Sequence, residues 1–529
     1  MTKHGMKALL DERPDLRELL FPRGYLLTDD HKVDTGAYPF YGRWSSTVFG
    51  GYRFLIHPKQ KLHIRWKNGI GVALVGHAFN PLEQESNIAE TDLLEKALTY
   101  YAEDEAGFTS YFNRWTGNFT LFILQEKDLR IYGDPAGMQM AFYGTCNDKT
   151  YCASHTNLLG DLCGLSFDPY IEKLTHYRFF PLLGSSLPGD LSPYSAFKRL
   201  IPNHFVQLKR DGWSVVRFFP TKDNGLLDTP YEQVVERTAQ ILTNTLEIIP
   251  RKWNRPAISL TGGFDSKTTL ACAEGQYEKY AYFSYNSSSP EAVDAEAASK
   301  ICAMLGLPHR IYEIPQEDAA VKDCGQIRML MDYNSGSIGK SNANDVRKRA
   351  FFLQTADFDV EVKSWVSEIA RAYYHKRFAK KHFPRKLTPQ YARSLYKVFI
   401  TDRKLIRETD RIFADYLRKY YSDGAFERIP WYDLFFWEFR MSSWNGLVIT
   451  GEHQIAYDIT IPYNNRMLLQ LLLSTPVEKR IQDLPHRDIM KKMNPAVADC
   501  GISVVNVKHT ASRAKMERIY LGLFSRLRF

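Results

Sequence analysis

The sequence predicts a mixed α/β protein of two domains: an α+β domain built on antiparallel sheets, then a doubly wound parallel sheet with a helical C-terminal part. From about residue 50 to 220, alternating apolar runs are separated by turn signals such as Lys67-Asn68-Gly69, a pattern typical of packed antiparallel strands. A stretch near residue 220 that is rich in Gly, Pro, Asp and Asn indicates a linker. Beyond it, short apolar runs alternate with helical spacing, which predicts a parallel sheet covered on both faces.

Five segments carry the strand pattern of the first domain: 48–57, 62–78, 117–135, 140–154 and 204–219. One helix-like insert, at 90–104, interrupts them. In the second domain, apolar residues three or four positions apart predict a helix at 231–249. Strands are expected at 257–260, 280–285 and 309–314, and mainly helices from 345 onward.

Length and composition exclude several classes of protein. A chain of 529 residues is too long for one ordinary hydrophobic core. Hydrophobic residues at 44% and aromatic residues at 14% exclude a disordered chain. There is no signal-peptide pattern and no apolar window of about 18 residues, so we expect a cytoplasmic protein that does not engage a membrane. Seven scattered cysteines without a C-x-x-C pair predict free thiols rather than structural zinc.

The formal charge of +9 is spread thinly, although basic residues concentrate at 371–386 and in the C-terminal segment 508–529. No nucleic-acid recognition motif accompanies them. We therefore interpret these runs as solvated faces or as a basic cleft for an anionic small molecule, and expect no nucleic-acid partner.

The segment AISLTGGFDSKTTLACA, residues 257–273, places Gly262 and Gly263 between an apolar run and a helix-like run. The loop that leaves the carboxyl end of a parallel strand faces the ligand crevice, and the next helix points its amide groups at an anion there. The two glycines let the main chain approach such an anion closely. Beside them stand three hydroxyl donors and one candidate Mg²⁺ ligand, namely Ser259, Thr261, Ser266 and Asp265.

Spacing excludes two common phosphate loops. A P-loop requires a second glycine five positions after the first, whereas Lys267 stands five positions after Gly262. The G-x-G-x-x-G fingerprint is absent as well. From the residues alone, an anion-binding loop and a tight turn that binds nothing both stay open.

The stretch SLTGGFDS, residues 259–266, resembles the S-G-G-x-D-S pyrophosphate-binding loop of adenine-nucleotide hydrolases, which cleave ATP between its α and β phosphates. From about residue 50 to 500 the chain is similar to the asparagine-synthetase-like family. The resemblance implies ATP and Mg²⁺ as cofactors. The nucleotide contacts that it implies are Ser259, Thr261, Gly262, Gly263, Asp265, Ser266, Phe283 and Ser284.

The resemblance also implies catalytic residues. VSEIARAYY, residues 366–374, is similar to the family's G-x-G-x-D-E-L-x-x-G-Y element, with Glu368 at its glutamate and Ser367 in place of its aspartate. Arg487 stands where the family has a lysine; because arginine stays protonated, we expect it to bind charge. For Glu368, a surface pairing with Arg371 stays open. The implied catalytic residues are Glu368, Arg487, Lys267 and Tyr333, and the implied metal ligands are Asp265 and Asp294.

Residues 115–144 resemble the closing strands of the class II glutamine amidotransferase domain, which implies an Ntn-like antiparallel sandwich. Asp134 stands at that family's RDxxG turn, and Gly76-His77 replace its glycine-asparagine pair. The family's nucleophile is an N-terminal cysteine, whereas Thr2 follows the first methionine here. We therefore expect no glutaminase activity, with Thr2 as an N-terminal nucleophile left as an alternative.

The expected divisions are an extension at 1–45, the amidotransferase-like domain at 46–220, the ATP-binding ligase domain at 221–510 and a basic tail at 511–529.

The resemblance implies an AMP-forming carbon–nitrogen ligase that adenylates a carboxylate and passes it to an amine or ammonia. Its logic resembles that of β-lactam synthetases and lasso-peptide macrolactam synthetases more closely than that of a glutamine-dependent enzyme. Two alternatives stay open: an ATP pyrophosphatase that modifies a nucleobase, and a nucleotide-binding regulator with a decayed active site. As substrates we expect small-molecule or peptide carboxylates and amines. A homodimer is an open alternative to a monomer.

Overall fold

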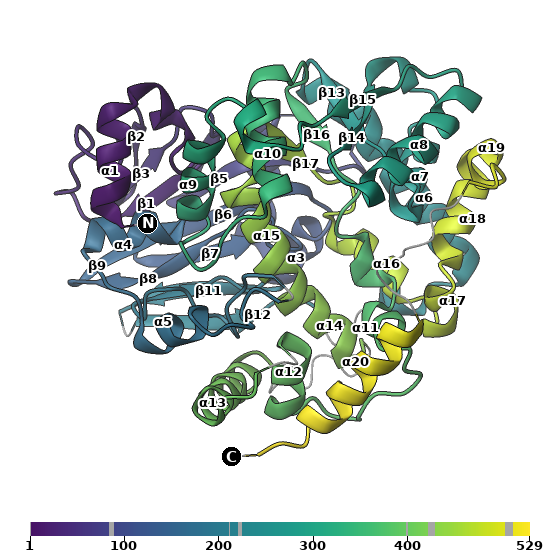
Figure 1. Cartoon of the computed structure of the whole chain (residues 1–529). Helices are drawn as coiled ribbons and strands as arrows, with labels where there is room; N and C mark the ends of the chain where they lie inside the picture. Colours follow the sequence, from purple (N-terminus) through teal and green to yellow (C-terminus); the bar gives the residue numbers. More distant parts are fainter. Residues whose placement is uncertain are drawn as a thin grey trace.

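A computed structural model describes residues 2–83, 89–182, 184–210, 212–220, 225–397, 400–421, 429–502 and 511–528. The expected domain limits at residues 221 and 510 lie outside the described residues. The fold is mixed α/β, with two antiparallel sheets, one parallel sheet and many helices (Figure 1), which confirms the fold class at this level.

Two six-stranded antiparallel sheets form the first part of the chain. The first sheet has the strand order β10 (Phe197–Arg199), β8 (Phe142–Cys146), β9 (Lys149–Ala153), β1 (Tyr25–Thr28), β3 (Tyr52–Ile56) and β2 (Ser45–Phe49). The second has the order β12 (Gly212–Arg217), β11 (His204–Lys209), β7 (Asp128–Gly133), β6 (Thr116–Gln125), β5 (Ile70–Phe79) and β4 (Leu62–Lys67).

Alternating apolar side chains hold these two sheets face to face. Tyr25 and Phe54 of the first sheet share a buried cluster with Val75 and Phe122 of the second, since every second residue of a strand points to the same face. On the outer face of the second sheet, α2 (Glu90–Glu103) and α3 (Glu105–Phe112) bury a separate apolar cluster against β5 and β6.

The described residues 2–45 contribute a helix and a strand to this domain, whereas we expected an extension at 1–45. β1 lies inside the first sheet, where Leu27 pairs with Phe54 on one side and Cys152 on the other. All four of its residues are buried. In addition, α1 (Lys3–Glu12) buries Met6 in the neighbouring core. A strand of four residues is too short for its periodicity to be recognised in the sequence.

The third sheet is parallel throughout, with the order β15 (Arg310–Glu313), β14 (Ala281–Asn286), β13 (Pro256–Ser259), β16 (Val360–Val362) and β17 (Asp458–Thr460). The sequence predicts β13, β14 and β15. It misses β16 and β17, which have three residues each and lie in the region expected to be mainly helical. The strand order reverses between β13 and β16, which creates a crevice at their carboxyl ends.

Helices pack on both faces of the third sheet. On β14, Phe283 contacts Phe352 of α10 (Ala343–Thr355). Tyr282 precedes it and therefore points to the opposite face, near Cys302 of α8 (Ser289–Met304). The other helices are α4 (Thr156–Cys163), α5 (Pro169–Thr175), α6 (Tyr231–Lys252), α7 (Phe264–Cys272), α9 (Cys324–Asn334), α11 (Tyr373–Arg377), α12 (Pro389–Tyr396), α13 (Arg403–Tyr420), α14 (Trp431–Phe435), α15 (Ser442–Gly451), α16 (Arg466–Leu473), α17 (Val477–Ile481), α18 (Leu484–Met493), α19 (Pro495–Ala498) and α20 (Ala511–Phe524).

Residues 511–524 form the helix α20, which packs against the rest of the protein, whereas we expected a basic tail at 511–529. Glu517 of α20 forms an ion pair with Arg377 of α11 at 2.9 Å, with both side chains less than a tenth exposed. Leu521 is buried as well. Among the described residues, no helix has the length and apolar character that crossing a membrane requires.

The two parts of the chain meet at the turn after β7. Asp134 is fully buried, and three backbone amides of its own turn donate to its carboxylate at 2.6–3.1 Å. From the second part, Asn464 donates from Nδ2 to Asp134 Oδ1 at 2.9 Å. The same side chain accepts at Oδ1 from the amide of Ala136 at 2.9 Å. Asn464 therefore provides hydrogen-bond partners for buried polar groups of the turn.

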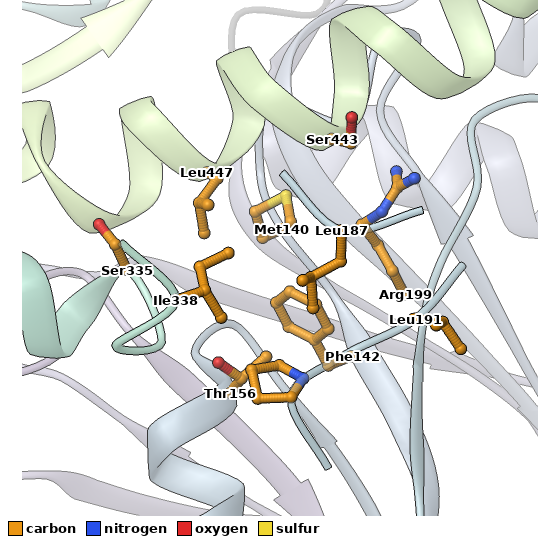
Figure 2. A pocket seen from close by; sticks show the side chains of 11 residues that line it. Met140, Phe142, Thr156, Leu187, Leu191, Arg199, Ser335, Ile338, Ser443 and Leu447 are labelled. Carbon is orange, nitrogen blue, oxygen red and sulfur yellow. The ribbon is translucent and has the colours of Figure 1, made fainter. Parts of the chain in front are cut away.

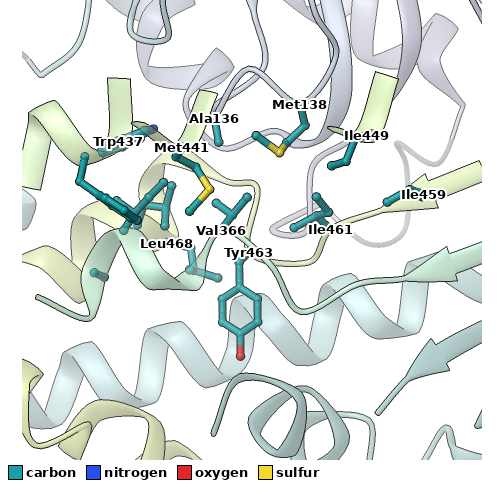
Figure 3. Packing of buried hydrophobic residues seen from close by; sticks show 14 of the residues in the cluster. Ala136, Met138, Val366, Trp437, Met441, Ile449, Ile459, Ile461, Tyr463 and Leu468 are labelled. Carbon is teal, nitrogen blue, oxygen red and sulfur yellow. The ribbon is translucent and has the colours of Figure 1, made fainter. Parts of the chain in front are cut away.

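Apolar packing surrounds this contact. Ala136 and Met138 of the turn share one buried cluster with Ile461 and Leu468 of the second part (Figure 3). Tyr463, next to Asn464, points its hydroxyl away from that cluster (Figure 3) and donates to the backbone carbonyl of Asp265 at 3.2 Å. The interface is thus linked directly to the loop at 259–266.

We expect Asn464→Ala to lower the free energy of unfolding by about 3 kcal/mol, because the substitution leaves buried donors and acceptors without partners. Urea denaturation followed by circular dichroism measures the change. The matched control, Asn254→Ala, removes an exposed asparagine side chain and should change the value by less than about 0.5 kcal/mol. Equal effects of the two substitutions would contradict the role given to Asn464.

Candidate active site

A cavity of about 380 Å³ opens at the carboxyl edge of the third sheet. Residues that end or follow β13, β14 and β16 form its floor, so it lies where the strand order reverses. The described residues that line it are Ser259, Leu260, Thr261, Asp265, Ser266, Ser284, Tyr285, Ser288, Pro290, Glu291, Asp294, Ala295, Lys363, Ser364, Trp365 and Glu368.

The loop between β13 and α7 forms one wall. Ser266 Oγ donates to the carbonyl of Thr261 at 2.8 Å and accepts from its amide at 3.1 Å, which closes the loop on itself. The amide of Gly262 donates to Asp294 Oδ1 at 3.1 Å. A carboxylate oxygen therefore lies where a phosphate oxygen would accept from this amide. The N-terminus of α7 adds a field that favours negative charge at the same place.

Asp265, in the first turn of α7, is held from several sides. Ser367 and Arg371 both donate to its carboxylate, and Arg371 also binds Asp483 at 2.7 Å. His486 Nε2 lies 3.6 Å from Asp265 Oδ1. Burial lowers the pKa of His486 to about 4, so its ring is neutral at pH 7. The carboxylate of Asp265 is thus fixed in place by the protein itself.

Glu368 lines the cavity from a 3₁₀ turn at Ser367–Ala370. Its Oε2 is shielded from solvent and has no hydrogen-bond partner among the described residues. Burial first, and then the charge of Asp265, raise the pKa of Glu368 to about 7. The alternative of a surface pairing fails, because Arg371 forms its ion pairs with Asp265 and Asp483 instead. A carboxyl group that titrates near neutral pH in a cavity is suited to proton transfer.

Two non-glycine residues with left-handed backbone flank this acid. Val366 has φ +78° and Ala372 has φ +52°. A β-branched residue rarely adopts this conformation, and it persists where the surrounding structure imposes it. The packing around Glu368 therefore fixes the backbone on both sides of this acid.

Lys267 and Arg487 lie outside the cavity, beside the ring of Phe264. Lys267 Nζ donates to the carbonyl of Ile502 at 2.8 Å. The guanidinium carbon of Arg487 lies 5.0 Å from the centroid of the Phe264 ring, and the side chain is exposed. The structure therefore brings Glu368, but neither of these cations, to the cavity wall.

Tyr333 is not part of the site, contrary to the prediction. It lies on α9, where its hydroxyl donates to both carboxylate oxygens of Asp161 on α4, at 2.7 and 2.8 Å. Burial among the residues between α9 and the first sheet keeps it there. The side chain of Phe283 also points away from the cavity and stacks on Phe358, with ring centroids 4.9 Å apart. Phe283 is not among the described residues that line the cavity, and its carbonyl accepts from the amide of Leu260 at 2.8 Å.

The first domain has a much smaller cavity beside Gly76 and His77. Its volume is about 10 Å³, which is roughly one water molecule. His77 fills the space: its Nε2 lies 3.2 Å from Thr460 Oγ1, and its ring meets Trp253 edge-on at 4.8 Å. A further cavity between the two parts of the chain, around Met140, is only about 20 Å³ (Figure 2).

Thr2 lies away from these cavities. Its Oγ1 accepts from the amide of Gly5 at 3.3 Å and so caps α1, and the residue is exposed. This is the ordinary part of a threonine at a helix start, and nothing in the geometry favours Thr2 as a nucleophile.

The acidic residues of the main cavity fit a Mg²⁺ ion that arrives with phosphates. No group of three His, Cys, Asp or Glu side chains that could hold a metal occurs within the described ranges. Mg²⁺ bound to phosphates needs only one or two protein carboxylates. Asp265, Asp294 and Glu368 all line the cavity, and Glu368 offers a shielded oxygen without a partner. This set does not fit a metal held by the protein alone.

Sequence reasoning missed Lys363, Trp365 and Arg371. The first two follow β16 directly and line the cavity. Because β16 has only three residues, no periodic signal marked the edge of the sheet where they stand. The sequence suggests Arg371 only as a partner of Glu368, because its ion pairs with Asp265 and Asp483 join segments that are far apart in the chain.

The chain has a distant sequence relative among known proteins. No family model matches the chain. The chain is similar to glutamine-hydrolyzing asparagine synthetase 1 of Bacillus subtilis (strain 168), with 22% identity over 233 residues. The matched region is 44% of this chain and 35% of that protein, so it spans about a third of the relative's length.

Two solved structures show weak likeness. One is an allosteric regulatory enzyme of purine biosynthesis, at 10% identity and TM-score 0.23, covering 56% of this chain and 60% of that one. The other is the glutamine phosphoribosylpyrophosphate amidotransferase of Bacillus subtilis with ADP and GMP, at 11% identity and TM-score 0.21, covering 66% and 71%. TM-scores this low do not establish a common overall fold.

We expect Glu368→Gln to remove a pH dependence of stability. The pKa of Glu368 in the folded protein, about 7, lies above the ordinary value of 4.5. Between these values the folded protein holds a proton that the unfolded chain releases, so the free energy of unfolding falls as pH rises through this window. At pH 8 the variant should therefore be more stable than the wild type, by roughly 1–2 kcal/mol since Glu368 is partly solvated.

Urea denaturation at pH 5 and pH 8 measures this difference. Glu274→Gln, at an exposed acid, is the control and should follow the wild type at both pH values. A Glu368→Gln variant with the wild-type pH slope would refute the raised pKa.

Proposed function

We propose that the protein is an ATP-dependent, AMP-forming carbon–nitrogen ligase, which adenylates a substrate carboxylate and transfers the acyl group to an amine or ammonia. The observation that carries this proposal is the position of the 261–266 loop. It leaves a central parallel strand, opens α7 and faces a cavity of about 380 Å³ that also holds Glu368. The similarity to asparagine synthetase supports the reaction class.

ATP would lie along the carboxyl edge of the sheet. Its β and γ phosphates would accept from the amides of the 261–266 loop, in the place where Asp294 now accepts from Gly262. Adenosine would lie over the end of β14, beside Ser284 and Tyr285. Asp265 and Asp294 would hold Mg²⁺, which supplies positive charge that offsets the phosphate charge.

The chemistry then has two displacements. A substrate carboxylate oxygen attacks the α-phosphorus, the bond from that phosphorus to the bridging oxygen breaks, and pyrophosphate leaves with the electron pair. The nitrogen nucleophile next attacks the acyl carbon, and AMP leaves. Glu368 is placed to accept the proton that the nitrogen loses, since its pKa of about 7 suits a base at neutral pH. Because the first domain has no ligand-sized cavity beside His77, we propose that it supplies no ammonia from glutamine.

A second candidate is a nucleotide-binding regulator without turnover. It is favoured by Ser367, which stands in place of an acid, and by Arg371, whose guanidinium holds the carboxylate of Asp265. A nucleobase thiolase is less well supported, because no cysteine is among the described residues that line the cavity.

Exchange of labelled pyrophosphate into ATP, measured across a panel of carboxylic acids with Mg²⁺ present, tests the ligase. We expect exchange that requires one class of acid, with AMP as the nucleotide product. Asp265→Asn should slow the exchange about 100-fold or more, the usual size of losing one well-aimed electrostatic group.

Asp499→Asn, at an exposed acid on a different loop, should leave the exchange rate within about twofold, as surface substitutions ordinarily do. ATP binding without exchange for any acid would favour the regulator. Formation of ADP in place of AMP would contradict the ligase.

A further inference from the structure

The side chains that line the main cavity are mostly acidic. The described residues that line it include the four carboxylates Asp265, Glu291, Asp294 and Glu368, and the single cation Lys363. Two cations behind the wall are already paired with two of these acids, Arg371 with Asp265 and Lys348 with Glu291. Under the proposed function, the cavity must also admit a triphosphate and a substrate carboxylate. Anions in a poorly solvated space repel strongly, so the reacting centre needs a cation of the protein's own as well as any ion that comes with ATP.

Lys363 is held at the sheet edge by its surroundings. Its amide donates to the carbonyl of Thr460 on β17 at 3.0 Å, which extends the ladder of β16 by one residue. Its Nζ lies 2.7 Å from Glu361 Oε1, with the two side chains 3% and 0% exposed. The same nitrogen lies 4.7 Å from the centroid of the Trp365 ring, within the range of a cation–π contact. The ammonium group is thus both buried and oriented.

Glu361 ties this lysine to the strand that leads into the loop. Because Glu361 and Lys363 are two residues apart, they point to the same face of the sheet. On the neighbouring strand β13, Ala257 pairs with Glu361, and Ser259 lies two residues further along the same strand, on the same face. Ser259 and Lys363 both line the cavity, so the ammonium group lies next to the start of the 261–266 loop.

The strand order decides which part of ATP would meet Lys363. β14, β13 and β16 are adjacent in that order, so the adenosine side over β14 and Lys363 beyond β16 lie on opposite sides of β13. The loop after β13 would hold the β and γ phosphates. The α-phosphate, which joins the two, would then lie above the end of β13 and in reach of the neighbouring lysine.

We propose that Lys363 is a catalytic residue that contacts the α-phosphate, with Glu361 and Trp365 as its positioning residues. This rests on the proposed function. The sequence suggests Arg487 as the residue that stabilises charge on the phosphates, but Arg487 lies outside the cavity. We assign this role to Lys363 instead. When the carboxylate oxygen bonds to the α-phosphorus and pyrophosphate departs with the electron pair, no proton moves. Lys363 keeps its three protons and offsets the charge that gathers on the non-bridging oxygens.

Binding of AMP and of adenosine, each measured by calorimetry on the full chain, tests the contact. AMP carries the α-phosphate and adenosine lacks it. We expect the wild type to bind AMP more tightly than adenosine. In Lys363→Met the Kd of AMP should rise about tenfold or more, as for the loss of a charge-assisted hydrogen bond, while the Kd of adenosine changes less than about twofold.

Lys252→Met is the matched control. Lys252 forms a comparable buried pair with Glu90, at 2.8 Å and with side chains 5% and 7% exposed, and it does not line the cavity. It should leave both Kd values unchanged. Since Lys363→Met leaves Glu361 buried without its partner, circular dichroism checks its folding. If the single variant is unfolded, the double variant Glu361→Gln/Lys363→Met, which removes both charges, takes its place.

The outcomes separate the two proposals. A variant that keeps the wild-type preference for AMP overturns the role of Lys363 and leaves the ligase standing. Equal loss of AMP and adenosine binding in a folded variant also overturns it, because a purely structural lysine would act in that way. A wild-type protein that binds neither ATP nor AMP overturns both proposals.

Discussion

The buried contact between Asn464 and Asp134 is the constraint on which the candidate site depends. Asn464 completes the turn of the first domain, and the residue before it, Tyr463, donates to the backbone of Asp265. One short segment after β17 therefore contacts the sandwich on one side and the start of α7, at the 261–266 loop, on the other. The first domain therefore helps to position the candidate site through this contact, independently of any reaction of its own.

The carboxylate of Asp265 is held by the protein itself. Ser367 and Arg371 both donate hydrogen bonds to it. The guanidinium of Arg371 therefore supplies positive charge beside Asp265. Additional carboxylates at this position would instead favour a bound metal ion. Lys363, which lines the cavity, is buried against Glu361, and Arg371 binds the carboxylate of Asp265.

The sequence predicts the strand, loop and helix at 257–273, because this signal is local: two glycines, hydroxyls and an acid between an apolar run and a helical run. Seven of the predicted site residues line the cavity, namely Ser259, Thr261, Asp265, Ser266, Ser284, Asp294 and Glu368. The predictions of site residues are wrong where tertiary packing determines the direction of a side chain. Tyr333 is drawn to Asp161 because α9 packs on α4, and Lys267 points to a different side of α7 from Asp265. β1, β16 and β17 are too short for periodicity, which hid Lys363 as well.

A crystal structure of the complex with Mg²⁺ and the α,β-methylene analogue of ATP tests the central claim most directly. We expect the β and γ phosphates against the amides of residues 262–266, adenine over the end of β14, and Asp294 displaced from the Gly262 amide. A nucleotide bound elsewhere, with the hydrogen bond between Gly262 and Asp294 intact, would contradict the assignment of this loop to pyrophosphate.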